Sequence, residues 1–133
     1  MNKIHKILLI LSIFLLIAGC SQNKEIVLPN SEDIEKIEIT NNKDNRKLEI
    51  FDEEKVDELI KSLINKGKYV NKESVNDQPT NIDEYHIISF YYKEKKENPS
   101  IIYLYKNGGK YYMEQPYQGI WKIDEEIYEK INS

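Results

Sequence analysis

The sequence of 133 residues contains a single cysteine, Cys20, so no internal disulfide bond is possible and the core must be held by packing alone. Its five glycines include no glycine-rich loop of the kind that cradles phosphate groups. After the N-terminal segment, His86 is the only histidine, and no Gly-x-Ser-x-Gly turn occurs. We therefore expect neither a zinc site nor a serine hydrolase, and no metal or cofactor.

Basic clusters are also missing. The chain has 19 basic and 23 acidic side chains, a formal net charge of -4. Without residues 1–19 the chain loses Lys3 and Lys6, which leaves 17 basic against 23 acidic side chains, a formal charge of -6. An acidic chain without a basic patch is not expected to bind nucleic acid, or to bind anionic lipid by charge alone.

The chain also lacks an apolar run long enough to span a bilayer. Residues 7–17 are apolar apart from Ser12, and they follow the basic residues Lys3 and Lys6. A helix of about eleven residues rises only ~16 Å, whereas the hydrocarbon core of a bilayer is ~30 Å thick. A short apolar run after a positive start, ending in small residues, is typical of an export signal that is removed.

The end of this run, Ile17-Ala18-Gly19-Cys20, resembles a bacterial lipobox. The resemblance implies that residues 1–19 are a lipoprotein signal peptide and that Cys20, once acylated, becomes the first residue of the mature chain. Residues 20–33 would then be the lipidated cysteine and a tether, with the protein anchored at the extracytoplasmic face of the cell membrane. The alternative is an ordinary signal peptide in which the cysteine is incidental.

Residues 34–133 are expected to form a single α+β domain. Alternating apolar residues predict a hairpin from strands near 34–40 and 47–51, and further strands at 84–93, 100–106 and 110–114. Between them, an apolar stripe over 53–66 predicts a long amphipathic helix capped by Asp52 and stopped by Gly67. A short strand near Tyr69 and a short helix after Asp124 complete the prediction: an antiparallel sheet of about five strands, with the long helix packed on one face.

Two features suggest a surface for binding. Residues 71–83 form a long proline-containing loop without clear periodicity, and such loops are often functional. Tyrosines are concentrated on the three later strands, where they either pair across the sheet or form a partly exposed aromatic face that binds a peptide or glycan. The candidate ligand-binding residues are Tyr117, Trp121, Tyr112, Glu114, Asn76 and Asp77.

The segments Glu73–Pro79 and Glu114–Trp121 carry a family resemblance. Together with the lipobox and Ile26-Val27-Leu28-Pro29, they resemble a family of small Gram-positive lipoproteins catalogued as a domain of unknown function. That resemblance implies no activity and supplies no catalytic residues.

The favoured hypothesis is a non-catalytic lipoprotein that binds a peptide, a protein or a cell-envelope component. One version is immunity to a cationic antimicrobial peptide, which the acidic charge would attract. One alternative is an accessory or sensing subunit of a membrane complex. Another is a cell-envelope enzyme that uses Glu84 and His86 for acid-base chemistry, although the sequence offers no nucleophile to accompany them.

Overall fold

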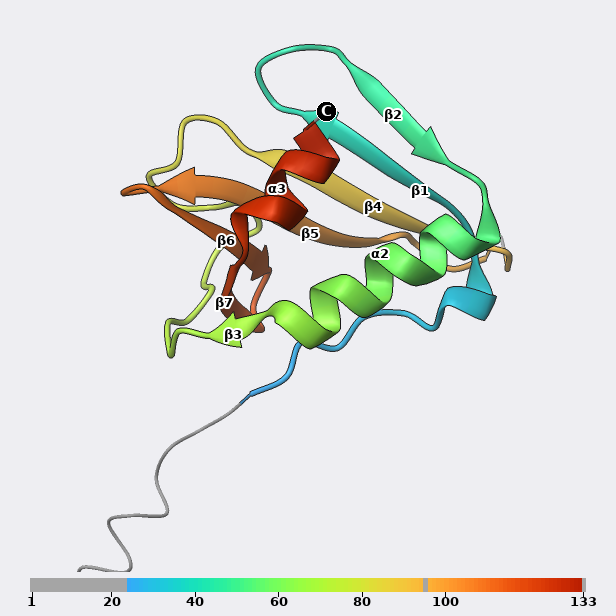
Figure 1. The fold of residues 1–133 in the computed structure, drawn as a ribbon, viewed down its shortest axis with the longest axis horizontal. Helices are drawn as coiled ribbons and strands as arrows, with labels where there is room; N and C mark the ends of the chain where they lie inside the picture. Colours follow the sequence, from blue (N-terminus) through green and yellow to red (C-terminus); the bar gives the residue numbers. More distant parts are fainter. Residues whose placement is uncertain (1–23, 95, 133) are drawn as a thin grey trace, which may run out of the picture.

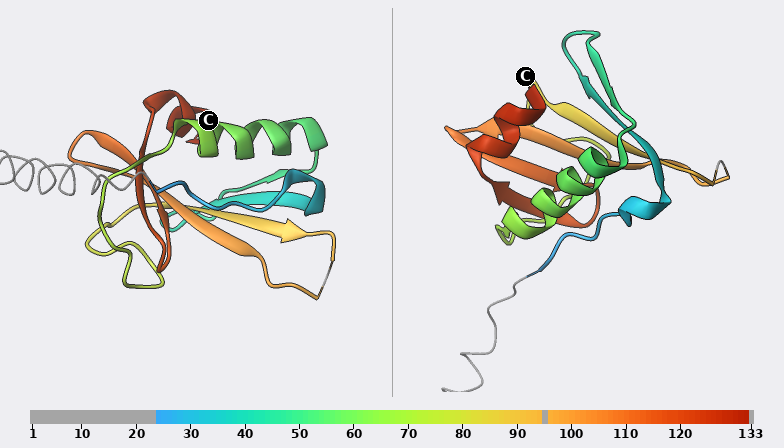
Figure 2. Two further views of the ribbon diagram at one scale, coloured as in Figure 1. Left: turned by 90° about the horizontal axis from the view of Figure 1, so that it is seen from below. Right: turned by 45° about the vertical axis from the view of Figure 1, so that its right-hand side comes forward.

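A computed structural model describes residues 24–94 and 96–132. These residues form a mixed α/β fold, an antiparallel sheet with two α-helices on one face (Figures 1 and 2). In chain order the elements are η1 (Ser31–Asp33), β1 (Ile34–Asn41), β2 (Lys47–Ile50), α2 (Glu53–Lys66), β3 (Lys68–Tyr69), β4 (His86–Tyr92), β5 (Ser100–Asn107), β6 (Lys110–Gln115), β7 (Gly119–Ile123) and α3 (Glu125–Asn132).

The sheet has seven strands in the order β2-β1-β4-β5-β6-β7-β3, and every pairing is antiparallel. The expectation of about five strands was therefore too low. The strand absent from the prediction is β7, because it is short, follows directly on the turn at Pro116 and begins with a glycine, Gly119. The short strand predicted near Tyr69 is present as β3, and it pairs with β7 at the far edge of the sheet.

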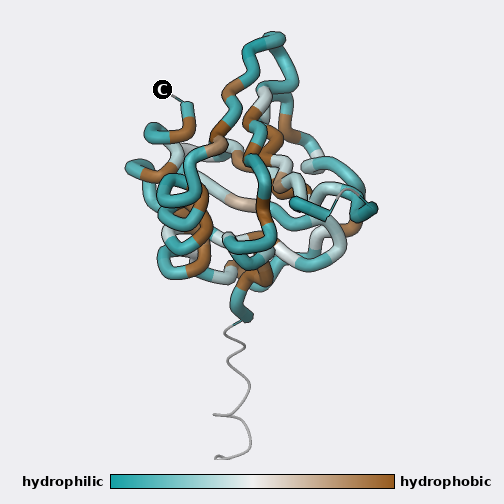
Figure 3. The backbone as a smooth tube through the Cα atoms, turned by 90° about the vertical axis from the view of Figure 1, so that its right-hand side faces the viewer, coloured by the Kyte–Doolittle hydropathy of each residue, from teal (hydrophilic) through white to brown (hydrophobic). Residues whose placement is uncertain are grey.

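Helix α2 begins where the sequence predicted. The side chain of Asp52 accepts a hydrogen bond of 3.1 Å from the backbone N–H of Lys55, which satisfies one of the free donors of the first turn. Its apolar residues recur along one side of the helix, coloured brown in Figure 3. The buried members are Val56, Leu59, Ile60 and Leu63.

The chain crosses the sheet twice, once on each face. Helix α2 connects the edge strand β2 to the opposite edge strand β3 over one face (Figure 1). To reach β4, the chain must return past β7, β6 and β5, a distance of about 19 Å at the usual strand spacing of ~4.8 Å. Residues 70–85 make this return on the other face (Figure 2, left), which explains why the loop is long.

The two faces of the sheet have different side chains because neighbouring residues of a strand point to opposite sides. The face under the helices carries the main core, including Ile37, Ile88, Phe90, Leu104 and Trp121, which are at most 1% exposed. The face under the return loop carries a second, smaller cluster. Its buried members are Tyr85, Tyr103 and Tyr105, with Ile82, Ile87 and Tyr112 packed against them.

The segment before β1 is packed against the domain from the first described residue. Ile26 is 4% exposed within the main core. The indole N–H of Trp121 donates a 2.8 Å hydrogen bond to the carbonyl of Lys24, and the Gln115 amide donates to the carbonyl of Val27 at 3.0 Å. Part of the expected tether is therefore a docked arm. Cys20 and the signal segment lie outside the described residues.

Within residues 24–94 and 96–132, no helix combines the length and apolar character needed to cross a membrane.

Candidate functional site

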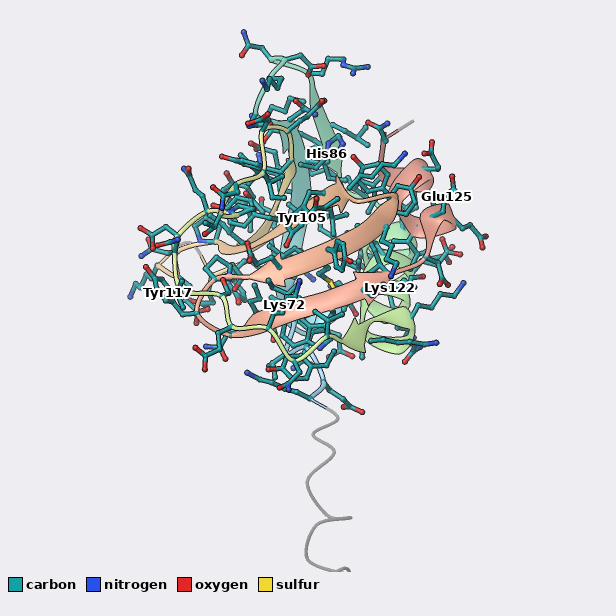
Figure 4. The ribbon with its side chains drawn as sticks, turned by 90° about the vertical axis from the view of Figure 1, so that its left-hand side faces the viewer. Lys72, His86, Tyr105, Tyr117, Lys122 and Glu125 are labelled. Carbon is teal, nitrogen blue, oxygen red and sulfur yellow. The ribbon has the colours of Figure 1, made fainter. Side chains whose placement is uncertain are left out.

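A cavity of about 180 Å³ lies between the second face of the sheet and the return loop. The strands contribute one wall and the loop the other, and Figure 4 labels Tyr105 on the strand side and Lys72 on the loop side. The residues lining the cavity are Tyr105, Asn107, Tyr112, Glu114 and Ile120 from the strands, and Lys72, Glu73, Val75, Thr80 and Ile82 from the loop.

The strand wall is built from tyrosines paired across neighbouring strands. Tyr105 and Tyr112 are register partners on β5 and β6, and their ring centroids are 5.8 Å apart. Further along the same face, Tyr85 and Tyr103 make an edge-to-face contact at 5.3 Å. Cross-strand aromatic pairs stabilise a sheet. The tyrosines are therefore structural, and Tyr105 and Tyr112 also line a cavity.

Glu114 is the acidic side chain of the strand wall. It pairs in register with Tyr103 on one side and Ile120 on the other, and it is 5% exposed. Within the described part of the chain, its carboxylate has no hydrogen bond and no ion pair. Burial raises the pKa of the Glu114 carboxyl above its ordinary value of 4.5. Burial, and secondly the Glu114 charge, raise the pKa of the Tyr105 hydroxyl.

The return loop is bracketed by two asparagines in the left-handed conformation, Asn71 at φ 56° and Asn81 at φ 60°. Asparagine tolerates this conformation better than most residues, so both bends suit the sequence. Between them, Asn76 donates a 2.7 Å hydrogen bond to Thr80. Ser74 is buried, and its hydroxyl has no hydrogen-bond partner among the described residues.

One long-range hydrogen bond joins the loop to the turn between β6 and β7. The hydroxyl of Tyr117 donates to Asp77 Oδ1 at 2.6 Å, which raises the pKa of the phenol. Tyr117 has φ 61° and follows Pro116 in a turn closed by the bond from Gln118 N–H to the Gln115 carbonyl. That position of such a turn usually holds glycine or asparagine. A tyrosine there is strained, and strained residues are concentrated at functional sites.

The structure divides the predicted ligand-binding residues into three groups. Tyr112 and Glu114 line the cavity. Asp77, Tyr117 and Asn76 hold the loop that covers it. Trp121 is separate from both, because it points to the helix face, is 1% exposed and packs against Tyr69.

Sequence reasoning did not single out Tyr105, Lys72, Thr80 or Ile82 as site residues. For Tyr105 a signal was present, because strand alternation places it on the same face as Tyr112 once the hairpin register around Asn107–Lys110 is known. The loop residues had no such signal, since no periodicity constrains where an irregular segment lies.

A second cavity, of about 250 Å³, adjoins His86. It lies under the helix face, between the β1–β2 hairpin and the end of α3, and Asp44, Arg46 and Asn132 also line it. His86 is 6% exposed and makes an edge-to-face contact with Tyr128 at 5.6 Å. Burial lowers the pKa of His86, and the carboxylates of Glu84 and Asp44 oppose that shift.

The Glu84 and His86 pair has no direct hydrogen bond. Glu84 instead accepts a 3.1 Å hydrogen bond from the side chain of Asn41. Among the described residues, no three His, Cys, Asp or Glu side chains are grouped so that they could hold a metal ion. Among residues 24–94 and 96–132, Thr40 is the one serine, threonine or cysteine that lines the His86 cavity.

The chain belongs to a family described as "Domain of unknown function (DUF5300)". The family model, named DUF5301, matches residues 22–122. This confirms the resemblance to an uncharacterised family. The fold is similar to a solved structure titled "NMR structure of the protein from Ruminococcus gnavus", at 26% sequence identity and a TM-score of 0.64, covering 78% of this chain and 99% of that one. No curated protein matches the chain.

Proposed function

We propose that this protein is an extracytoplasmic lipoprotein, anchored by Cys20, that binds a peptide or another cell-envelope component without converting it. The binding site is the cavity beneath the return loop. The observation that carries this proposal is the loop-covered wall formed by Tyr105, Tyr112 and Glu114. The lining combines aromatic and aliphatic side chains with polar groups, and in small-ligand sites such polar groups fix the orientation of the ligand.

The loop gives the cavity a means of opening. It is an irregular segment held by few side-chain hydrogen bonds, and one of them joins Asp77 to the exposed Tyr117. Segments with little buried apolar surface open more easily than the core strands. Opening at the Asn71 and Asn81 bends would admit a ligand without disturbing the sheet or the helices.

The binding site can be tested by amide chemical-shift mapping on residues 21–133. A part of the chain this long is expected to fold alone, because the similar NMR structure matches 78% of this chain over 99% of its own length. Peptides, glycans and lipid headgroups from the envelope are added in turn. We expect shifts at Tyr112 and its cavity neighbours, and loss of binding in Tyr112→Leu. Tyr91→Leu, on the same sheet face outside the cavity, is the matched control.

Shifts confined to the His86 cavity would contradict this site. They would favour the second candidate, an envelope enzyme, for which the cavity beside a buried histidine is the supporting observation. In that case His86→Phe would abolish an activity that Tyr112→Leu leaves intact.

The anchor has its own test. Intact mass measurement of the membrane-extracted protein should show a chain that begins at Cys20 and carries acyl groups. Cys20→Ser should release the protein from the membrane fraction, whereas Ser21→Ala should leave it there. Two acyl chains suffice for stable anchoring, since each buried methylene contributes ~0.8 kcal/mol. Retention of the Cys20→Ser protein on the membrane would contradict the anchor.

A further inference from the structure

We propose that the loop-covered cavity takes a cationic group, an alkylammonium or guanidinium, with Glu114 as its counterion. This inference rests on the proposed function and adds the chemistry of the ligand.

The first argument is the missing partner of Glu114. The side chain is 5% exposed and lines the cavity, yet no hydrogen bond or ion pair reaches its carboxylate from the described residues. Acidic side chains are almost never this buried unless they are paired, because removing a charge from water without compensation is costly. A cation that enters with the ligand would supply the partner that the described residues do not provide.

The second argument is the chemistry of the surrounding wall. Tyr105 and Tyr112 stand beside Glu114, and their rings are tilted by only 31° at 5.8 Å. The hydroxyl of Tyr105 makes no hydrogen bond within the described part of the chain. Aromatic faces attract ammonium and guanidinium groups, and more strongly where water is excluded. A carboxylate next to two tyrosine rings is therefore better suited to a cation than to an anion.

The third argument is size. A cavity of about 150 Å³ holds a benzene-sized molecule. At about 180 Å³, this cavity has room for the end of one lysine-like or arginine-like chain, and not for a whole sugar or a folded peptide. The remainder of a larger ligand would lie outside, along the loop and its exposed residue Val75.

The charged residues at the mouth are Lys72 and Glu73, both on the loop and both exposed. Lys72 is the obvious internal competitor for Glu114, but it makes no ion pair with it. Lys72→Gln should therefore improve the affinity for a cation, because a like charge is removed from the entrance. Loss of cation binding in Lys72→Gln would overturn the inference.

The experiment compares matched small molecules on residues 21–133 by chemical-shift titration and calorimetry. Butylammonium and propylguanidinium are the cations, 1-pentanol is the uncharged control and butyrate is the anionic control. We expect the cations to shift the amides of Val75, Ile82, Tyr105, Tyr112 and Ile120, and 1-pentanol and butyrate to bind at least tenfold more weakly.

Variants then test whether Glu114 supplies the negative charge that binds the cation. Glu114→Gln keeps the shape of the side chain and should weaken cation binding at least tenfold. Glu54→Gln, an exposed carboxylate on helix α2 across the sheet from the cavity, should change it less than threefold. Binding to the wild-type protein should also decline as the pH falls and Glu114 becomes protonated. Thermal unfolding of each variant verifies that it is folded.

The outcomes separate this inference from the proposed function. Equal binding of 1-pentanol, or full affinity in Glu114→Gln, would overturn the cationic assignment while the cavity remained a binding site. If neither these probes nor any envelope component shifts the cavity amides, both proposals fail.

A basic peptide side chain and a free polyamine share the proposed chemistry. To distinguish these two sources, the binding of spermidine is compared with that of a short peptide that contains one lysine and has blocked termini. Tighter binding of the peptide would assign a peptide ligand, and tighter binding of spermidine would assign a free amine.

Discussion

The phenol of Tyr117 reaches across 40 positions of the chain and donates a 2.6 Å hydrogen bond to the carboxylate of Asp77. It connects the turn between β6 and β7 to the middle of the loop that covers the cavity. Tyr117 also has φ 61°, so the residue whose side chain holds the loop closed is itself in a strained backbone conformation.

This link predicts that Tyr117→Phe opens the loop without unfolding the domain. The phenylalanine variant keeps the ring and the backbone but loses the donor, so amides in 71–81 should exchange with solvent several-fold faster while the core strands stay protected. Asp77→Ala removes the acceptor and should have a similar effect, and the double variant should add little, since both changes remove the same interaction. Additive effects in hydrogen-exchange measurements would show that the two residues act independently.

Gly119 should not tolerate a side chain. Its φ is 157°, and an added Cβ would lie 3.0 Å from the Tyr69 ring and 3.2 Å from the Trp121 ring. Neither ring has room to move, because Trp121 is buried and Tyr69 packs on it. We expect Gly119→Ala to lower the free energy of unfolding by about 1–3 kcal/mol, measured in urea. Gly108→Ala is a partial control, since its Cβ would meet nothing within 4 Å and only the φ of 60° is unfavourable. Equal costs for the two changes would contradict the clash.

Trp121 should hold the N-terminal arm in place. Trp121→Phe removes the donor to the Lys24 carbonyl and part of a fully buried ring, at an expected cost of about 1–3 kcal/mol. Limited proteolysis should then cut within residues 24–30 faster than in the wild type. Tyr91→Phe, remote from the arm, should leave the cleavage rate unchanged. An arm that stays resistant in Trp121→Phe would show that the buried Ile26 and the bond from Gln115 to the Val27 carbonyl are sufficient to hold it.

The buried acid should make stability depend on pH. Because the pKa of Glu114 is raised in the folded state, the folded protein holds that proton more tightly than the unfolded chain. The resulting stability is fully present below the ordinary value of 4.5 and is lost as the pH rises through the folded pKa. The other titratable groups near it are Tyr103, Tyr105, Tyr112, Lys72 and Glu73.

Glu114→Gln should therefore be more stable than the wild type at pH 7, and this difference should shrink toward pH 4. Urea unfolding across this range measures the effect. A difference that stays constant with pH would mean that Glu114 titrates normally and is not desolvated.

The local elements of the fold were predictable from the sequence, because their signals are local. Asp52, the apolar stripe and Gly67 mark α2 at the residues where it begins and ends. Alternation marks β1 and β2, which pair as the predicted hairpin. Strand β7 was harder, since its five residues follow directly on a turn.

The site was only partly predictable because alternation does not say which face of a sheet is covered. Tyr112 and Glu114 lie on the loop face, whereas Trp121 pairs with Met113 and lies with it under the helices. A shift of one residue in register would exchange these faces. Neither the path of the return loop nor the Tyr117–Asp77 contact has a local signature, since both depend on the strand order.

The docked arm determines which way the domain would face if Cys20 carries the lipid. Lys24 is four positions after Cys20, and a fully extended chain spans at most roughly 14 Å over four positions. Lys24 is held by Trp121, and its ammonium donates a hydrogen bond to the Gln118 carbonyl in the β6–β7 turn, so this turn would lie close to the lipid headgroups. The domain would then sit on the bilayer in a preferred orientation, with β3 near the surface and the β1–β2 hairpin away from it (Figure 1).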